Sequence, residues 1–549
     1  MFNKSKRFYI ISGIVLVIII AGVLVWRNFK YKFVNKKIDQ LVEVKSRGLY
    51  EVNYQNLVID EAGGNITAEN VEILPDSLVY QYMQEQNTAP ENLFYIKIPK
   101  LHITGVRTPK ALLNKEISAH IIRIENAQIE IRIGKGKKED KPDFGKFMDP
   151  GMYRQLLGKL KSITADSVVL DNANLVLLDK DSKKINYKTD GLSLRFASIS
   201  IDSLTRNDST RILFSKELTI HCNQFVLPFK DKMYTLIVDG LDYNSHTASL
   251  HTDRIRLDPA LSETAFAKAH KYAIDRLDIK IGSLDLKNID RMAMLHQQLV
   301  ADSLLLKNAS FHIFRDKSYP HDSVDRTHAY PQESIMRLSL PVSIKKIVFN
   351  DSYIEYKEKN DKSDSSGKVS FFHVTATLHN VTNMRENLKL NNQMRLNFNA
   401  SFLNQTPFTA DIRMRLNDRY GNFRMDAQLG GLNAVDLNPL IKPMALAEME
   451  KGKITSLRYH LDATNTHAKG RLIFQYDDLS LKLLKKDDDK NKYKTKFFPT
   501  LAAGLVIKKS NPQNGKLRTA DVDYQRDIYR SIFNLMWKSL FSGIKQVVK

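Results

Sequence analysis

The chain has 549 residues, of which 43% are hydrophobic, and a net charge of +22. This length and apolar content exclude a globally disordered protein and are sufficient for two or three domains or for one extended repetitive body. The positive charge points to either nucleic acid or an anionic membrane surface as a partner. Because Cys222 is the only cysteine, an intramolecular disulfide and any multi-cysteine metal site are excluded.

The first predicted element is a membrane helix over residues 8–26. This stretch carries no charge and, at about 1.5 Å per helical residue, spans roughly 28 Å, which is enough to cross a bilayer. Trp26, Arg27 and Lys30 follow where a cleavable signal peptide would have small residues, so we expect an uncleaved anchor. We expect residues 1–7 to be a cytoplasmic tail, because a long following domain is translocated whole despite the basic residues after the helix.

Beyond the anchor, apolar and polar residues alternate over short runs, a pattern typical of β-strands. One unit recurs five times: an apolar-x-apolar pair, a short polar turn, and a second apolar-x-apolar pair. The turn positions are Asn126, Asn172, Cys222, Asn308 and Asp351, roughly 46, 50, 86 and 43 residues apart. Such a period predicts a repeated sheet unit extended along one axis. Its apolar face must be buried against a second sheet, inside a closed barrel, or against lipid, and the alternation itself leaves these three open.

Helical patterns are few: residues 152–160, a short piece after Pro259, and a C-terminal amphipathic helix within residues 521–549. The apolar face predicted for the C-terminal helix comprises Ile528, Ile532, Leu535, Met536, Leu540 and Ile544. A helix of this kind usually packs on its own domain, which is the favoured interpretation. The alternative is a membrane interface, for which Trp537, Phe541 and Lys538 are the candidates.

The sequence shows no catalytic constellation. The histidines are dispersed, and the pairs His246 with His251 and His460 with His467 lack a carboxylate arrangement. Neither a phosphate-binding loop nor a nucleophile-elbow serine is present. The basic excess is spread along the chain, which disfavours nucleic acid. We therefore predict no enzymatic activity, no metal, no cofactor and no nucleic-acid partner.

Three stretches carry a resemblance to a known family: GKVSFFHVTA at residues 367–376, DLNPL at 436–440 with GKI at 452–454, and GRLIFQYDDL at 470–479. With the N-terminal helix and the long run of degenerate strands, the chain resembles the AsmA-like family of bridge-like lipid-transfer proteins. The resemblance implies a mainly β fold in which an elongated, twisted antiparallel sheet of degenerate repeats forms an open apolar groove. It divides the chain into a β-groove body at 36–340 and an AsmA-like C-terminal β module at 341–520.

The resemblance further implies an inner-membrane, single-pass protein whose body lies in the periplasm and passively transfers phospholipid in support of outer-membrane biogenesis. Expected partners are phospholipids, the inner membrane and, as a further candidate, outer-membrane proteins. The alternative function is a scaffolding envelope protein with a closed β core. The groove candidates that the resemblance implies are Ile122, Ile124, Ile129, Ile131, Val168, Leu170, Leu175, Leu177, Ile220, Phe225, Leu227, Leu304, Leu306, Phe311, Ile313, Ile347, Phe349, Ile354 and Tyr356.

Overall fold

The computed structural model describes residues 46, 48–106, 115–134, 160–205, 208, 210–229, 231–359, 365–487, 492–495 and 507–549. The chain is mainly β, with 59% strand and 14% helix, which confirms the mainly β part of the predicted fold class. It divides into two compact units. Unit 1 comprises residues 1–255 and 287–298, and unit 2 comprises residues 256–286 and 299–549.

The predicted membrane helix at residues 8–26 and the tail at 1–7 lie outside the described residues, as does nearly all of the predicted helix at 152–160. Within the described ranges, no helix is long and apolar enough to cross a membrane.

Unit 1 is built from strands that pair mostly with their neighbours in sequence. Its strands are β1 (Tyr50–Asp60), β2 (Asn65–Pro75), β3 (Asn92–Thr104), β4 (Glu116–Glu125), β5 (Gln128–Ile133), β6 (Ser162–Asp179), β7 (Ile185–Ile201), β8 (Glu217–Pro228) and β9 (Tyr234–Asn244), and its helices are α3 (Ser77–Glu85) and α7 (Arg291–Leu295). β10 (Ser249–Pro259) crosses the boundary between the units. β3 pairs antiparallel with both β4 and β5, and β6, β7, β8 and β9 pair antiparallel in succession.

Unit 2 repeats this arrangement and extends it. Its strands are β11 (Arg276–Ile281), β12 (Ser283–Lys287), β13 (Leu299–Lys307), β14 (Ser310–Asp316), β15 (Val342–Lys359), β16 (Gly367–Thr382), β17 (Gln393–Phe402), β18 (Thr406–Arg415), β19 (Phe423–Leu429), β20 (Leu432–Asn433), β21 (Ala447–Ala463), β22 (His467–Asp487), β23 (Lys492–Thr495) and β24 (Thr519–Gln525). Its helices are α6 (Glu263–Lys268), α8 (Pro331–Met336), α9 (Arg385–Leu390), the short 3-10 helix η3 (Ala434–Leu437), α10 (Asn438–Ala445) and α12 (Ile532–Val548). From β15 to β19, and on through β21, β22 and β24, the pairing is antiparallel.

Each unit also contains two parallel pairings, so the prediction of an antiparallel sheet is wrong and the sheet is mixed. In unit 1, β4 and β5 both pair with β6 in parallel. In unit 2, β13 and β14 both pair with β15 in parallel. Apolar alternation specifies which face a residue occupies but not the direction of the neighbouring strand, which depends on the connection between the strands.

The predicted polar turns do not reverse the chain. Asn126, Asn172, Asn308 and Asp351 have φ of 54°, 51°, 51° and 47°, and each kinks the chain without reversing it. Asparagine and aspartate tolerate this left-handed conformation better than other non-glycine residues, and such kinks are typical of β-bulges. In the third copy, Cys222 on β8 pairs with Leu192 on β7 and Leu241 on β9, and each of these follows a left-handed glycine, Gly191 (φ 61°) and Gly240 (φ 60°).

The parallel pairs superpose two predicted copies in register. In unit 1, Ile122 pairs with Val168 and Ile129 with Leu175. In unit 2, Leu304 pairs with Ile347 and Phe311 with Ile354. The kinks are joined alike: the N–H of Asn126 donates to the carbonyl of Asp171 at 2.9 Å, and that of Asn308 donates to the carbonyl of Asn350 at 3.0 Å. The two pairs are therefore the same backbone motif.

The C-terminal helix is shorter than the predicted segment 521–549. Residues Thr519–Gln525 form β24, and α12 begins at Ile532, where the Ser531 hydroxyl caps the N–H of Asn534. Alternating Val522 and Tyr524 fit a strand, and the N-cap serine marks the true helix start.

Candidate functional site

One face of unit 1 is a set of apolar rows that cross the strands. Residues paired directly across strands project from the same face. A representative row consists of Ala68, Leu101, Ile124, Leu170, Leu194, Ile220 and Tyr243. Through such rows the structure gathers on one face the predicted residues Ile122, Ile124, Ile129, Ile131, Val168, Leu170, Leu175 and Leu177, continued on β8 by Ile220, Phe225 and Leu227.

Unit 2 has an equivalent face. One row consists of Leu304, Ile347, Leu378, Leu396, Ile412, Met425, Leu461, Gly470 and Val522, and the next of Leu306, Phe349, Ala376, Phe398, Ala410, Ala427, Tyr459, Leu472 and Ala520. Beyond the kink, Phe311 and Ile313 pair with Ile354 and Tyr356. All eight predicted residues of unit 2 therefore lie on one apolar face that continues toward the C-terminus.

The two faces differ in burial. The eight predicted residues of the first two copies are 0% to 8% exposed. In the last two copies Leu306 is buried, but the other seven predicted residues are only half-buried, as are Ile220, Phe225 and Leu227 in the third copy. A soluble sheet normally buries its apolar face completely against a second layer. The later copies therefore leave part of their apolar face accessible to solvent.

Aromatic rings concentrate on the half-buried face of unit 2. The rings of Phe311 and Phe349 meet edge to face with centroids 6.0 Å apart. On β16 to β18, the Phe371 ring lies 5.7, 5.5 and 5.3 Å from the rings of Phe398, Phe402 and Phe408. Aromatic side chains bring large apolar area and hold their geometry through such contacts. The face consequently offers a preformed apolar surface.

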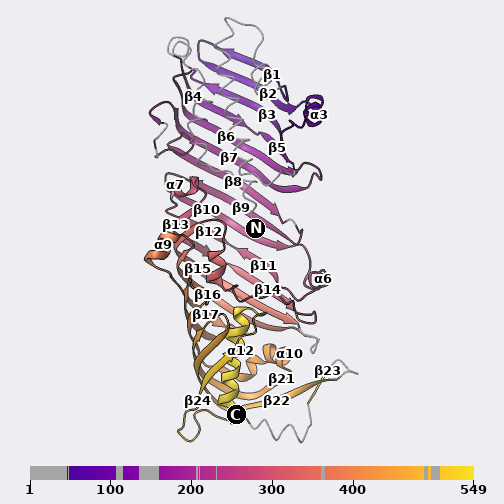
Figure 1. Cartoon of the computed structure of the whole chain (residues 1–549), viewed down its shortest axis with the longest axis vertical. Helices are drawn as coiled ribbons and strands as arrows, with labels where there is room; N and C mark the ends of the chain where they lie inside the picture. The colour runs from indigo at the N-terminus through magenta and orange to yellow at the C-terminus, as the bar shows by residue number, and fades with distance from the viewer. Residues whose placement is uncertain are drawn as a thin grey trace. The chain divides into compact units, whose positions relative to one another are not determined.

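Helix α12 covers the C-terminal end of these rows (Figure 1). Its Gly543 approaches β22 and β24 so closely that an added Cβ would lie 2.8 Å from Val522 and 3.0 Å from Leu472. The Tyr459 hydroxyl and the Ser539 hydroxyl are hydrogen-bonded at 2.8 Å. Of the predicted apolar face, Ile532 and Leu535 are buried in the hydrophobic core of unit 2. Met536, Leu540 and Ile544 are partly buried against this core, and Ile528 precedes the helix.

The interface candidates of α12 lie away from that packed side. Trp537 is 44% exposed, Lys538 is exposed and Phe541 is half-buried. Packing on its own domain, the favoured prediction, is thus confirmed for one side of α12, and the three candidates occupy the other.

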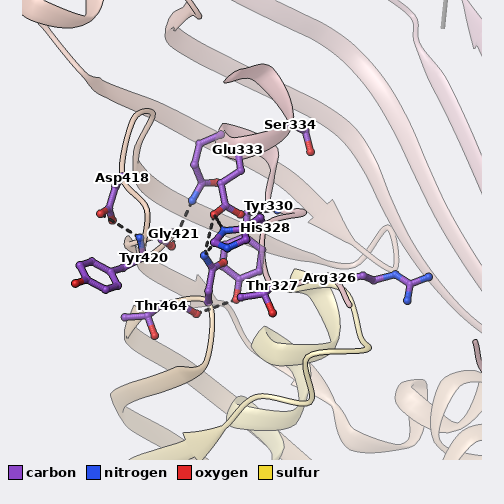
Figure 2. A network of polar contacts seen from close by, with 12 residues as sticks. Arg326, Thr327, His328, Tyr330, Glu333, Ser334, Asp418, Tyr420, Gly421 and Thr464 are labelled. Carbon is purple, nitrogen blue, oxygen red and sulfur yellow. Dashed lines mark hydrogen bonds and ion pairs between the residues drawn. The ribbon is translucent and has the colours of Figure 1, made fainter. Parts of the chain in front are cut away.

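A polar cluster fastens the connection from β14 to β15 in unit 2. Figure 2 shows His328, Tyr330 and Glu333 gathered between the loops that carry Tyr420 and Thr464. The Glu333 carboxylate accepts from the Asn465 amide at 2.8 Å and from the Tyr330 N–H at 3.1 Å, and its Oε1 lies 3.1 Å from Nδ1 of His328. The Tyr330 hydroxyl donates to the Thr464 carbonyl at 2.9 Å.

Arg526 completes this cluster from the segment after β24. It is 5% exposed and donates to the carbonyls of Asn465, Arg326 and Arg530 at 2.8, 2.8 and 3.0 Å, with its guanidinium 4.4 Å from the centre of the Tyr330 ring. Burial raises the pKa of Tyr330 to about 12. Because Arg526, Tyr330 and Glu333 join the connection to neighbouring loops through several hydrogen bonds, the cluster holds the connection in place. Sequence reasoning missed it because its members are spread from residue 326 to residue 526.

An ion pair between Arg326 and Asp322 also fastens the start of this connection. Arg326 binds the Asp322 carboxylate in bidentate fashion, at 2.6 and 2.8 Å. This contact lowers the pKa of Asp322 to about 2. Arg326 also donates to the Tyr529 carbonyl at 2.9 Å, so the pair links the connection to the segment that precedes α12.

On β21, His460 lies between Tyr459 and Leu461 of the apolar rows and therefore projects from the opposite, polar face. His460 sits between two carboxylates, with Nδ1 2.7 Å from Asp426 and Nε2 3.2 Å from Asp462. The hydrogen bond with Asp426 raises the pKa of His460. This carboxylate arrangement was not recognisable from the sequence, because Asp426 comes from the neighbouring strand β19 and Asp462 lies two residues after His460 on the same strand. Among the residues that the structure describes, no group of three or more His, Cys, Asp or Glu could hold a metal ion.

No protein-family model and no curated protein matches the chain.

Proposed function

We propose that the chain is a non-enzymatic envelope protein, similar to the AsmA-like family, that binds phospholipid acyl chains on its apolar sheet face. The observation that carries this proposal is the unit 2 face. There, continuous cross-strand apolar rows include half-buried side chains such as Phe311, Phe349 and Ile354. A contiguous apolar face that stays partly accessible to solvent is typical of a binding site for an apolar partner.

The physical chemistry of lipid favours such a face. Moving two acyl chains of roughly sixteen carbons into water costs on the order of 25 kcal/mol, at about 0.8 kcal/mol per methylene. An apolar row offsets much of this cost while the headgroup stays in water. Movement from one residue of a row to the next needs no catalytic group, so transfer is passive and requires neither cofactor nor metal.

The proposed location follows from the anchor predicted at residues 8–26. The protein would be held in the inner membrane of a two-membrane bacterium, with its body in the periplasm. Its partners would be phospholipids, the inner membrane and outer-membrane proteins, and its role would be to supply lipid for outer-membrane biogenesis.

A scaffolding protein with a closed β core is the second candidate. The observation that favours it is the first pair of copies, where residues such as Ile131, Leu175 and Leu177 are 0% exposed. A fully buried face of this kind leaves no surface for acyl chains.

The test is native mass spectrometry with lipid extraction on the full chain purified in mild detergent. We expect co-purified phospholipid in the unaltered protein and its loss in Ile354→Asp, because a half-buried charge on the apolar face repels acyl chains. The matched control is Val348→Asp on the opposite face of the same strand. A folded protein without lipid, or equal lipid in both variants, would remove transport as the leading function and favour the scaffold.

A further inference from the structure

Helix α12 carries a second apolar stripe, which lies outside the side of the helix that packs on its own domain. Phe533, Trp537 and Phe541 follow one another at intervals of four residues, so they line up along one side of the helix. Phe533 is 71% exposed and Trp537 is 44% exposed. The rings of Trp537 and Phe541 are stacked, 6.3 Å apart and 11° from parallel. We call these three residues the aromatic ridge.

The packed side of α12 already accounts for its ordinary core contacts. Leu535, Ser539, Gly543 and Val547 are buried at intervals of four residues. They lie on the side that meets β22 and β24. The helix is therefore held in a fixed orientation without the ridge, and the ridge is presented ready-made to an outside partner. Binding to it costs little ordering of the chain.

The charge around the ridge identifies the partner. The 17 residues of α12 contain no Asp or Glu. The exposed Lys538 follows Trp537, and the ammonium of Lys545 lies 4.7 Å from the centre of the Phe541 ring. Tryptophan and phenylalanine beside lysine match the boundary between acyl chains and headgroups, where rings enter the apolar layer and ammonium groups meet phosphate. Lysine attraction further requires a negatively charged surface.

We propose that the aromatic ridge docks the C-terminal end of unit 2 on an anionic lipid bilayer, with Phe533 and Trp537 inserted at headgroup depth and Lys538 and Lys545 on the lipid phosphates. One consequence rests on the proposed function. Because α12 covers the rows at Leu472 and Val522, docking brings the end of the apolar face next to the membrane. A lipid could then leave or enter the face there.

Tryptophan fluorescence tests the docking directly, since Trp26 and Trp537 are the two tryptophans. The full chain with Trp26→Phe, held in a non-ionic amphipol, reports from Trp537 alone. We expect phosphatidylcholine vesicles containing phosphatidylglycerol to shift its emission to shorter wavelength, and brominated chains to quench it. Pure phosphatidylcholine vesicles should act more weakly. Unchanged emission with both vesicles overturns the proposal and leaves a protein partner for the ridge.

Vesicle flotation of variants distinguishes binding through the aromatic ridge from non-specific binding of exposed apolar residues to lipid. We expect the double variant Phe533→Ser with Trp537→Ser to float about tenfold less, because two rings are removed from the lipid. The control is Leu390→Ser on α9, which removes a leucine that is 89% exposed in the same unit. Lys538→Gln with Lys545→Gln should abolish the preference for anionic vesicles. Equal flotation of the ridge variant and the Leu390→Ser control contradicts the proposal.

The two proposals fail separately. Ile354→Asp should lose co-purified lipid and keep the Trp537 shift, whereas the ridge variant should keep its lipid and lose flotation. Docking without bound lipid would refute transport alone, and bound lipid without docking would refute the ridge alone.

Discussion

The parallel pairs of the two units share a backbone but not an environment. β6 and β15 hold equivalent partners in the same register, and each is kinked at an Asn or Asp with positive φ. Yet Leu175 on β6 is 0% exposed, whereas the equivalent Ile354 on β15 is half-buried. The local sequence thus determines the path of the strand, and the coverage of its face depends on what the rest of the chain places over it.

The largest expected effect is on stability, and it tests whether the two faces differ in burial. Leu175→Ala should lower the free energy of unfolding by about 3 kcal/mol and Ile354→Ala by about 1 kcal/mol, because a fully buried side chain loses more apolar contact and leaves a larger cavity. Chemical denaturation followed by circular dichroism measures both. Equal losses would mean that the two faces are covered alike, against the partial exposure of the unit 2 face.

In unit 2, the ion pair of Asp322 and Arg326 lies in the connection between the parallel strands β14 and β15, and it should make the stability of the protein depend on pH. The pKa of Asp322 lies at about 2, below its ordinary 3.8. Its stabilisation is therefore complete above pH 4 and is lost as pH falls toward 2. We expect Asp322→Asn to cost about 2 kcal/mol at pH 7 and to flatten the dependence of stability on pH below 4. An unchanged acid limb of the stability profile would show that the pair does not fasten the connection.

A third prediction tests whether the kink is truly common to both units. Asn172→Val and Asn308→Val should each lower the free energy of unfolding by about 1 to 2 kcal/mol, because a β-branched side chain is strained at positive φ. Glycine at either position should be tolerated, since it adopts this conformation freely. Thermal unfolding of the four variants provides the measurement. A large difference between the two valine variants would show that the kinks are not equivalent.

The smallest effect sharpens the comparison at the fifth copy. Asp351 occupies the kink position, and its carboxylate lies 2.9 Å from Nδ1 of His373 on β16. Both side chains are exposed, so the pair contributes little. Asp351→Asn gives the kink the residue that unit 1 has, and we expect the free energy of unfolding to change by less than about 0.5 kcal/mol. A larger loss would assign the pair a structural role that unit 1 lacks.

Much of this architecture was predictable from alternation. Period two predicts the inward positions of the copies. The Asn and Asp at their centres predict turns, whereas the structure has kinks at these positions. The parallel pairing of copies was not predicted, because Ile122 and Val168 show which face they occupy but not which strand they meet. The exposed fraction of a side chain could not be predicted either, since Leu175 and Ile354 occupy the same inward apolar position in the sequence pattern but differ in burial. Phe533 escaped notice because it lies outside the face that packs on the domain.

The in-register stacking of copies has an evolutionary consequence. In each parallel pair, two copies are joined in register through backbone hydrogen bonds and matched apolar rows. Tandem duplication of a segment of this kind can lengthen the chain without redesigning the existing strands. The span of the protein is thereby open to selection in steps of one copy, and each new copy is free to diverge in side-chain size.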